Sequence, residues 1–130
     1  MSRPEEQIGR CVLVVPTQVR AVKGTDWASC VLCAVPSAVL AEALTGDYRR
    51  DFHENRLLRT CLVEPVDEEL ARAAAVLRAS VAPSRAPSAV DAIVVAQADR
   101  AGGATVLTSD PKDLRALARH TRNTVRISTG

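Results

Sequence analysis

Aromatic side chains are nearly absent from this 130-residue chain, in which Phe, Trp and Tyr occur once each and together make up 2% of the composition. Because base stacking depends on aromatic faces, this scarcity predicts that stacking platforms for nucleobases are not available. The core must be built from aliphatic residues, since hydrophobic residues still make up 47% of the chain. A chain of this length buries such a core without disulfides or a structural metal, so we expect one domain over residues 1–130.

Long apolar segments are also missing. No run approaches the roughly 18 residues that a membrane-spanning helix needs, and the N-terminal MSRPEEQIGR lacks the charged-then-apolar pattern of a signal peptide. We therefore expect a cytoplasmic protein without a membrane segment. The net charge of +2 is compatible with a polyanionic partner but does not require one.

Familiar catalytic motifs are lacking as well: the sequence contains no GxSxG and no Walker-type phosphate loop. His53 and His120 have no catalytic partner in view and are interpreted as surface residues. Cys30 and Cys33 form a CxxC, but a zinc site needs a second ligand pair, and a redox site needs the motif exposed at a helix start. Because CVLC lies inside an apolar run, we interpret the four cysteines as small core hydrophobes.

Strand-like and helix-like segments alternate along the chain. Short apolar runs predict strands, and apolar residues at helical spacing after a capping residue predict helices. The expected strands cover residues 11–15, 31–35, 61–66, 104–109 and 124–129. The expected helices cover residues 37–46, 47–60, 67–79, 88–101 and 111–121. This alternation predicts parallel pairing with right-handed crossovers, hence a three-layer α/β/α sandwich with a mostly parallel central sheet.

Three acidic residues in the second half of the chain have an ordinary structural explanation. Asp110 stands before Pro111, which predicts an N-cap followed by proline at the first helical position. Asp113 then occupies the third position, where a carboxylate favours the helix dipole. Asp91 follows Ser88 by three residues, the spacing of a capping box. Each carboxylate can be a helix cap alone or can also belong to a site.

Glu42 does not fit that explanation. It is the only charged side chain between Val31 and Leu44, late in a helix whose neighbours are apolar around most of the circumference. Burying an unpaired carboxylate there would cost several kcal/mol, so something positive must compensate. The compensating group is either an arginine from residues 47–60 or a divalent metal ion shared with other carboxylates, since Mg²⁺ and Mn²⁺ prefer oxygen ligands.

Two stretches, VPSAVLAEALTG and SAVDAIVVAQADRAGGATVLTSDPKDL, combine these acids in a specific order. They resemble the acidic motifs of PIN-domain nucleases, and in particular of VapC-type toxins of prokaryotic toxin–antitoxin pairs, with similarity over residues 34–129. The resemblance implies a PIN-like fold in which Glu42 takes the second acidic position, Asp91 the third and Asp110 the fourth. Asp113 matches an accessory acidic position, and Thr108 matches a hydroxyl beside the site.

The activity that this resemblance implies is hydrolysis of RNA phosphodiesters with Mg²⁺ or Mn²⁺. The carboxylates at the second, third and fourth acidic positions would be catalytic and would bind the metal together with Asp113, while Thr108 and Ser109 would orient water or phosphate. Family members of this type are usually homodimers that a small antitoxin holds inactive. The expected partners are therefore an RNA substrate, a VapB-like antitoxin and a second copy of the chain.

Arginines gather in residues 47–60 and in the Pro/Ser loop VAPSRAPSA. The expected RNA contacts are Arg49, Arg50, Arg56, Arg59 and Arg85. Phosphate contacts of this kind give salt-dependent binding with little sequence information. The alternative is an ordinary solvated charged face, because three acids interleave with these arginines: Asp47, Asp51 and Glu54.

The first 33 residues depart from the family pattern. Where relatives end their first strand with a metal-binding aspartate, the closest match is VVPTQV, with Pro16 in the aspartate's place, and the segment that follows is shorter than the usual first helix plus loop. Three explanations are open: Asp26 substitutes as a ligand, the start is misassigned or out of frame, or the protein is a degenerate member. A second functional hypothesis is therefore a PIN-like module that binds an antitoxin or RNA without cleaving.

Overall fold

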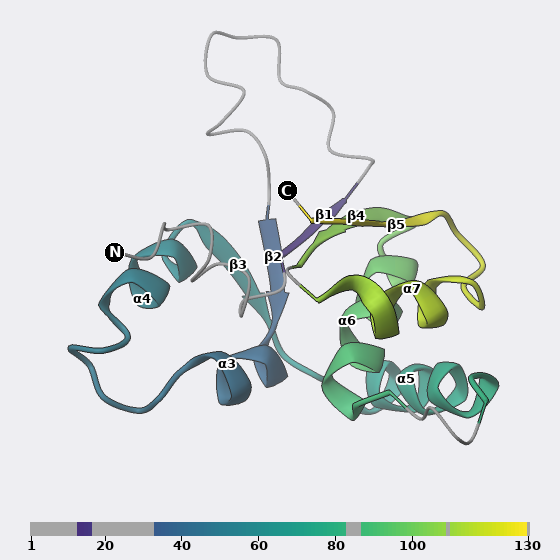
Figure 1. Cartoon of the computed structure of the whole chain (residues 1–130), viewed down its shortest axis with the longest axis horizontal. Helices are drawn as coiled ribbons and strands as arrows, with labels where there is room; N and C mark the ends of the chain where they lie inside the picture. Colours follow the sequence, from purple (N-terminus) through teal and green to yellow (C-terminus); the bar gives the residue numbers. More distant parts are fainter. Residues whose placement is uncertain (1–12, 17–32, 83–86, 109, 130) are drawn as a thin grey trace, which may run out of the picture.

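The computed structural model describes residues 33–82, 87–108 and 110–129, together with the backbone of residues 13–16. Within these ranges, strands and helices alternate as the sequence predicts (Figure 1). The strands are β1 (Leu13–Pro16), β2 (Cys33–Pro36), β3 (Cys61–Glu64), β4 (Ala104–Leu107) and β5 (Val125–Ser128). The helices are α3 (Ser37–Ala43), α4 (Phe52–Leu58), α5 (Glu68–Ser80), α6 (Ala89–Arg100) and α7 (Pro111–Ala118).

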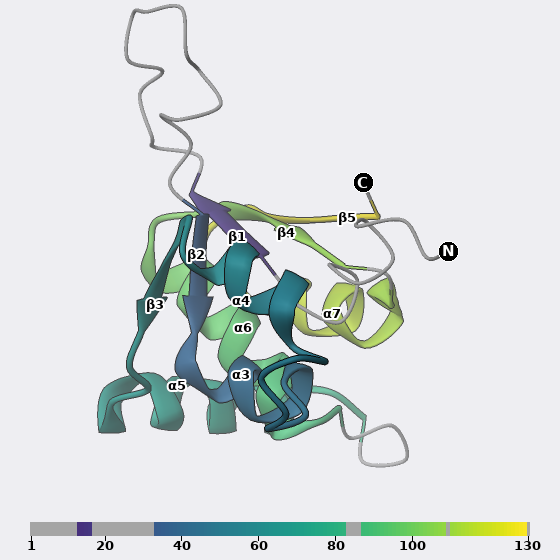
Figure 2. The ribbon, with the colours of Figure 1, turned by 90° about the vertical axis from the view of Figure 1, so that its left-hand side faces the viewer.

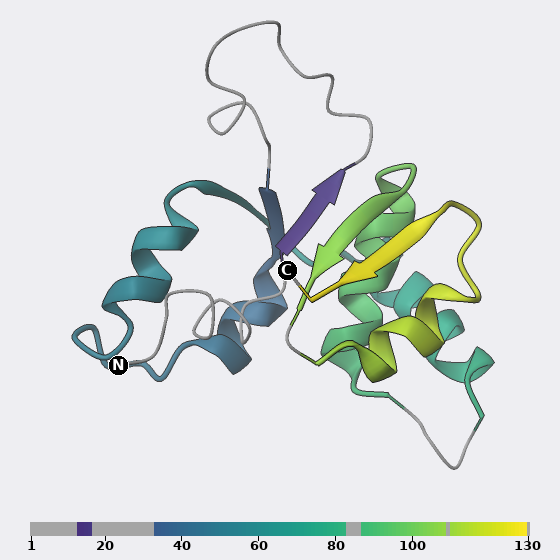
Figure 3. The ribbon, with the colours of Figure 1, turned by 45° about the horizontal axis from the view of Figure 1, so that its top comes forward.

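The five strands of the described chain form one sheet in the order β3-β2-β1-β4-β5. β2 pairs with β3 in parallel, and β4 pairs with β5 in parallel. β1 lies between these pairs and is antiparallel to both neighbours, so its arrow points against those of β4 and β5 (Figure 3). Four strands thus run in one direction, and the predicted mostly parallel sheet is confirmed except at β1.

The direction of β1 corrects the expectation that all strands pair in parallel. A parallel connection needs a crossover of a dozen or more residues, usually with a helix, whereas antiparallel neighbours do not. The segment after β1 is shorter than a first helix plus loop of the family, as the sequence already indicates.

Helices cover both faces of the sheet, which confirms the predicted layered α/β architecture. Figure 2 shows α4 on one face and α6 on the other. The β2–β3 connection and the β4–β5 connection lead to opposite ends of the strand order, so right-handed crossovers place their helices on opposite faces. α6 lies against the middle of the sheet, with α5 and α7 packed beside it.

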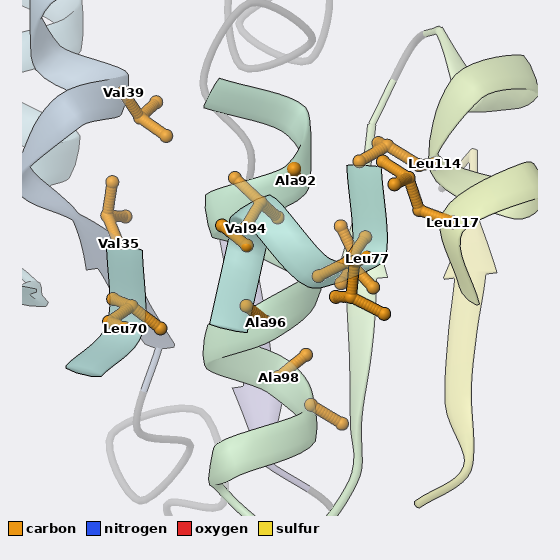
Figure 4. Close-up of a cluster of buried hydrophobic side chains, with 14 of the residues drawn as sticks. Val35, Val39, Leu70, Leu77, Ala92, Val94, Ala96, Ala98, Leu114 and Leu117 are labelled. Atoms are coloured by element: carbon orange, nitrogen blue, oxygen red, sulfur yellow. The ribbon is translucent and has the colours of Figure 1, made fainter. Parts of the chain in front are cut away.

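The core is aliphatic, as the composition predicts. α6 is buried around nearly its whole circumference, because it contacts the sheet, α5 and α7 at once. Its side chains Val94, Ala96 and Ala98 belong to one buried cluster with Leu70 and Leu77 of α5 and the leucines of α7 (Figure 4). This packing fixes α6 rigidly, and with it any side chain at the start of α6.

The predicted caps at Asp67 and Ser88 are confirmed, whereas α3 differs from its predicted bounds and α4 begins at Phe52 instead of residue 47. Asp67 caps α5 by accepting the Leu70 N–H at 2.7 Å, and Ser88 caps α6. The sequence predicts that α3 has Ser37 as its N-cap and reaches Gly46, but its N-cap is Pro36 and it ends at Ala43. Gly46 has φ +87°, a left-handed conformation that suits glycine, so it belongs to the turn after the helix.

Two of the four cysteines lie in the described residues, and both are free thiols packed partly buried against the core. Cys33 and Cys61 are register partners on β2 and β3. Burial raises the pKa of both thiols, which fits their predicted role as small core residues. Cys11 and Cys30 lie outside the described residues, so the CxxC pair stays a sequence observation. None of the described helices is long and apolar enough to cross a membrane.

Candidate active site

The predicted acids are carried by elements that meet at one edge of the sheet. β2 and β4 end at this edge, and in folds of this kind sites collect at the carboxyl ends of the strands. α3 follows β2 directly and carries Glu42, while β4 leads through Thr108 to Asp110 and α7. α6 begins nearby, and its first turn contains Asp91.

Asp91 is the most constrained of these acids. Its backbone N–H donates to the Ser88 hydroxyl oxygen at 3.1 Å, which confirms the predicted cap. Partial burial raises the pKa of the Asp91 carboxyl above its ordinary value, and the Ser88 side chain opposes this shift. The carboxylates of Asp113, Glu42 and Asp110 raise the pKa of Asp91 further by charge repulsion.

That repulsion has a geometric meaning. Carboxylates from α3 and from the start of α7 affect the pKa of Asp91 only because they lie near it, since charge interactions fade with distance and solvent screening. The acids that the sequence singles out therefore share one electrostatic neighbourhood. Among the residues that the structure describes, the ion pairs are Arg50–Asp47, Arg72–Glu68 and Arg100–Asp67, so none of these four acids is neutralised by a basic side chain.

Glu42 is exposed, which contradicts the prediction that it is buried among aliphatic neighbours. α3 has only seven residues and buries Val39 and Ala43 on one side, so the other side faces solvent. Because the Glu42 carboxylate is exposed, it carries no burial cost that a positive charge would have to offset. The expected arginine partner is also not found within the described segments. The case for Glu42 as a site residue now depends on its effect on Asp91.

Asp110 occupies the predicted N-cap position of α7, before Pro111, but its side chain makes no capping hydrogen bond there. Its backbone N–H donates to the Thr108 hydroxyl oxygen at 3.1 Å. Thr108 is 7% exposed, and its own N–H donates to the Ser128 carbonyl at 2.9 Å, so it ties the end of β4 to β5. The Asp110 carboxylate is exposed and available to a ligand.

Two further predicted residues flank this turn. Asp113 is exposed at the third position of α7, as expected for a carboxylate in a first helical turn. Ser109 lies outside the described residues, so its predicted role in orienting water or phosphate stays a prediction. Thr108 is already engaged in holding the turn, which makes positioning of Asp110 its visible contribution.

The four acids provide the kind of oxygen ligand that divalent cations prefer, but in the described residues they do not surround a common metal position. No group of three or more His, Cys, Asp or Glu side chains in the described ranges is arranged tightly enough to hold a metal ion. The donors are nonetheless all carboxylate oxygens, the kind that Mg²⁺ and Mn²⁺ prefer. A cation near Asp91 would remove the repulsion that raises its pKa.

Pro16 does not lie at the acidic edge, contrary to its alignment with the family's first aspartate. In the antiparallel β1–β4 pair, Pro16 is opposite Ala104 at the start of β4, whereas Leu13 is opposite Leu107 at its end. Because β1 is reversed, its carboxyl end lies at the edge away from Asp110. Asp26, the proposed substitute ligand, lies outside the described residues.

The arginines predicted to contact RNA lie on and before α4. Arg49, Arg50, Arg56 and Arg59 are exposed, whereas Arg85 lies outside the described residues. Sequence reasoning missed the two aromatic residues beside them, Tyr48 and Phe52, which are also exposed. Part of the signal was present in the spacing of Phe52 and Arg56, because residues four apart share one face of a helix, whereas Tyr48 lies in the turn before α4.

A hollow of about 500 Å³ lies at the C-terminal end of α6, away from Asp91, and is lined by residues such as Val76, Asp99 and Asn123. None of the four predicted acids lines it. The Asp99 carboxylate accepts the Arg122 N–H at 3.2 Å and the Asn123 N–H at 2.9 Å, so it holds the turn before β5. This hollow is therefore a structural feature separate from the acidic edge.

Comparison with known proteins agrees with the α/β fold. The family model of the PIN domain matches residues 27–120, so the chain belongs to the PIN domain family. The match begins after β1, in keeping with the departure of the first residues from the family pattern. No curated protein and no solved structure matches the chain significantly. PIN domains are typically nucleases that use divalent metal ions.

Proposed function

We propose that the protein is a metal-dependent endoribonuclease of the VapC toxin type, acting through Glu42, Asp91 and Asp110 with Asp113 as an accessory ligand. One observation carries the proposal: carboxylates from α3 and α7 raise the pKa of Asp91 on α6, and no basic side chain in the described chain pairs with any of them. Unpaired negative charges gathered at the carboxyl ends of the strands repel one another, and a bound cation would offset that repulsion.

In this proposal the four carboxylates would hold Mg²⁺ or Mn²⁺. Such an ion, when bound, supplies an activated water and stabilises the charge that develops on a phosphodiester. Asp91 provides the fixed side of the site, because α6 is locked in the core. Glu42 and Asp110 are exposed and can adjust to the ligand, and Thr108 holds the backbone of Asp110.

The test is cleavage of a single-stranded RNA with Mg²⁺, with Mn²⁺ and with excess EDTA. We expect cleavage only with metal, and a loss of more than about 100-fold in Asp110→Asn, because losing a direct ligand costs more than losing a supporting partner. Glu69→Gln is the matched control, since Glu69 is an exposed carboxylate in the first turn of α5. Equal cleavage by the wild type and Asp110→Asn would overturn the proposal.

The second candidate is a degenerate PIN-like module that binds without cleaving. It is favoured by the incomplete closure of the acids in the described ranges and by the reversed β1, which leaves Pro16 away from the site. Purified wild type that cuts no RNA with either metal, but binds RNA or an antitoxin, would establish this alternative.

The VapC assignment also carries a set of partners. We propose a VapB-like antitoxin, an RNA substrate, a homodimer and a cytoplasmic location, all of which rest on the family resemblance. Sedimentation of the purified chain tests the dimer directly: a single species at the monomer mass would contradict it. Co-expression with a VapB-like protein tests the antitoxin, which should co-purify and suppress cleavage.

A further inference from the structure

Two of the three aromatic residues of the chain lie together on the surface at α4. Tyr48 is 70% exposed and Phe52 is 52% exposed. With Asn55, Arg56 and Arg59 they line a small pocket of about 140 Å³. The prediction that no stacking platform is available does not hold at α4, because two of the few aromatic residues are concentrated there.

Two of the three acids that interleave with the arginines in the sequence, Asp51 and Glu54, are withdrawn from this surface, whereas Asp47 is exposed. Asp51 is 4% exposed and accepts the N–H of Thr45 at 2.9 Å and that of Gly46 at 3.0 Å. These backbone hydrogen bonds hold the pKa of Asp51 below its ordinary value. Glu54 is partly buried, and its Oε2 is fully buried without a hydrogen-bond partner among the described residues. Neither carboxylate faces outward with the arginines.

The outer surface therefore carries an excess of positive charge. Its exposed arginines are Arg49, Arg50, Arg56 and Arg59. Within the described residues only Arg50 has a carboxylate within ion-pair distance, Asp47 at 3.9 Å, and both side chains are exposed, so this pair is weak. The alternative of a mixed, self-neutralised charged face is inconsistent with this separation.

The ring of Phe52 has one aromatic neighbour among the described residues. The His53 ring meets it edge-to-face with a centroid distance of 5.5 Å. Phe52 opens α4, and the buried Asp51 anchors the preceding turn through Thr45. Order of this kind lowers the entropy cost of stacking a planar ligand on the ring.

We propose that Tyr48, Phe52, Arg56 and Arg59 form a subsite for single-stranded nucleic acid, here called the α4 subsite. Bases stack on the two aromatic rings, and the arginines contact the flanking phosphates. This inference rests on the proposed ribonuclease function, since it names how that enzyme holds its substrate. Residues 44–51 connect α3, which carries Glu42, to α4 (Figure 1).

Charge decides between nucleic acid and a protein partner. Two exposed aromatic residues alone could contact either kind of ligand. Exposed arginines that outnumber the exposed carboxylates favour nucleic acid, because each of its nucleotides carries a negatively charged phosphate. A nucleic-acid strand also matches the small size of the pocket, which accepts one planar group rather than a broad apolar face.

The experiment measures binding of a fluorescein-labelled single-stranded RNA of mixed sequence by anisotropy, in an Asp91→Asn background that prevents cleavage. The double variant Tyr48→Ser/Phe52→Ser should bind at least about tenfold more weakly, because each stacked base contributes substantially to affinity. Val76→Ser is the matched control, since Val76 is 68% exposed on α5, away from this surface. Exposed positions are chosen so that folding is retained, and melting curves verify it.

The arginines give a second readout. Arg56→Gln/Arg59→Gln should weaken binding and lower the slope of log affinity against log salt by about 0.7 for each phosphate that an arginine no longer neutralises. A merely structural role for these arginines would leave the slope unchanged. Unchanged slope together with unchanged affinity would overturn the α4 subsite.

The outcomes separate this inference from the ribonuclease proposal. If the aromatic double variant binds RNA as tightly as its parent while the wild type cleaves RNA, the α4 subsite is wrong and the nuclease proposal stands. If the aromatic variant binds weakly and the wild type never cleaves, the subsite stands and the nuclease proposal fails. If the variant changes only the sedimentation of the chain, the surface is a protein interface and the subsite is wrong.

Discussion

Asp51 and Asp91 occupy similar places and have opposite surroundings. Both lie at the start of a helix, Asp51 as the N-cap of α4 and Asp91 in the first turn of α6, and both are at least partly buried. Hydrogen bonds from Thr45 and Gly46 lower the pKa of Asp51, whereas burial and neighbouring carboxylates raise that of Asp91. The Asp51 carboxylate accepts hydrogen bonds from the protein itself. The Asp91 carboxylate has no positively charged partner among the described residues.

The contrast shows how a structural acid is distinguished from a site acid. A carboxylate that stabilises a protein collects donors, and its ionised form is favoured by folding. A carboxylate set aside for a ligand is kept near other carboxylates at some cost to stability, and the ligand removes that cost. The two aspartates should therefore respond oppositely to the same substitution.

The largest effect should be on catalysis by Asp91→Asn. We expect RNA cleavage to fall by more than about 100-fold while the fold is kept or slightly stabilised, because the change removes charge repulsion along with a proposed metal ligand. Cleavage rates and melting curves of the same preparation measure both. Loss of cleavage accompanied by loss of folding would not fit the assignment of Asp91 as a site residue.

Asp51→Asn should act on stability instead. An amide cannot accept from Thr45 and Gly46 as a carboxylate does, so the turn between α3 and α4 loses its anchor. We expect the melting temperature to fall by about 5 °C or more. Asp47→Asn is the control, since Asp47 is exposed, and a drop of similar size there would remove the distinction.

Addition of Mg²⁺ should raise the melting temperature of the wild type by about 5 °C at a concentration near ten times the dissociation constant. Asp91→Asn should show no such rise, and Asp51→Asn should show the full rise from its lower starting point. An equal rise in all three proteins would indicate a general salt effect rather than a site at Asp91.

The smallest effect should be the pH dependence of stability. The lowered pKa of Asp51 contributes stability that is present above the unfolded value of about 3.9 and is lost as pH falls through the folded pKa. The raised pKa of Asp91 has the opposite sign: its contribution is present below about 3.9 and is lost as pH rises through the folded pKa. Melting temperatures between about pH 3 and pH 6 should thus approach the wild-type values at low pH for Asp51→Asn and diverge from them with rising pH for Asp91→Asn.

Much of the fold could be predicted because its signals are local. The caps at Asp67 and Ser88 and the glycines after α6 mark helix ends within a few residues of sequence. The direction of β1 could not be predicted, because strand pairing depends on contacts far apart in the chain and on the connection that follows. A strand pattern alone is the same in either direction.

Motif spacing predicts the acids of the proposed site, but the predicted burial of Glu42 is wrong. Glu42 was placed among aliphatic neighbours by its sequence context, yet α3 is short and turns Glu42 to the solvent. In the same way, Asp51 and Glu54 interleave with arginines in sequence and are separated from them by burial. Neighbours in sequence predict neighbours in space only within a helix whose buried side is known.

The central claim is that Asp91 lies among unpaired carboxylates that serve a metal ion. Carbon-13 NMR titration of the Asp91 carboxyl, assigned with Asp91→Asn, tests it most directly in the presence and absence of Mg²⁺. The account predicts a pKa above the ordinary value for aspartate without metal and a clear decrease when Mg²⁺ is added. A pKa at or below the ordinary value that Mg²⁺ does not change would contradict it.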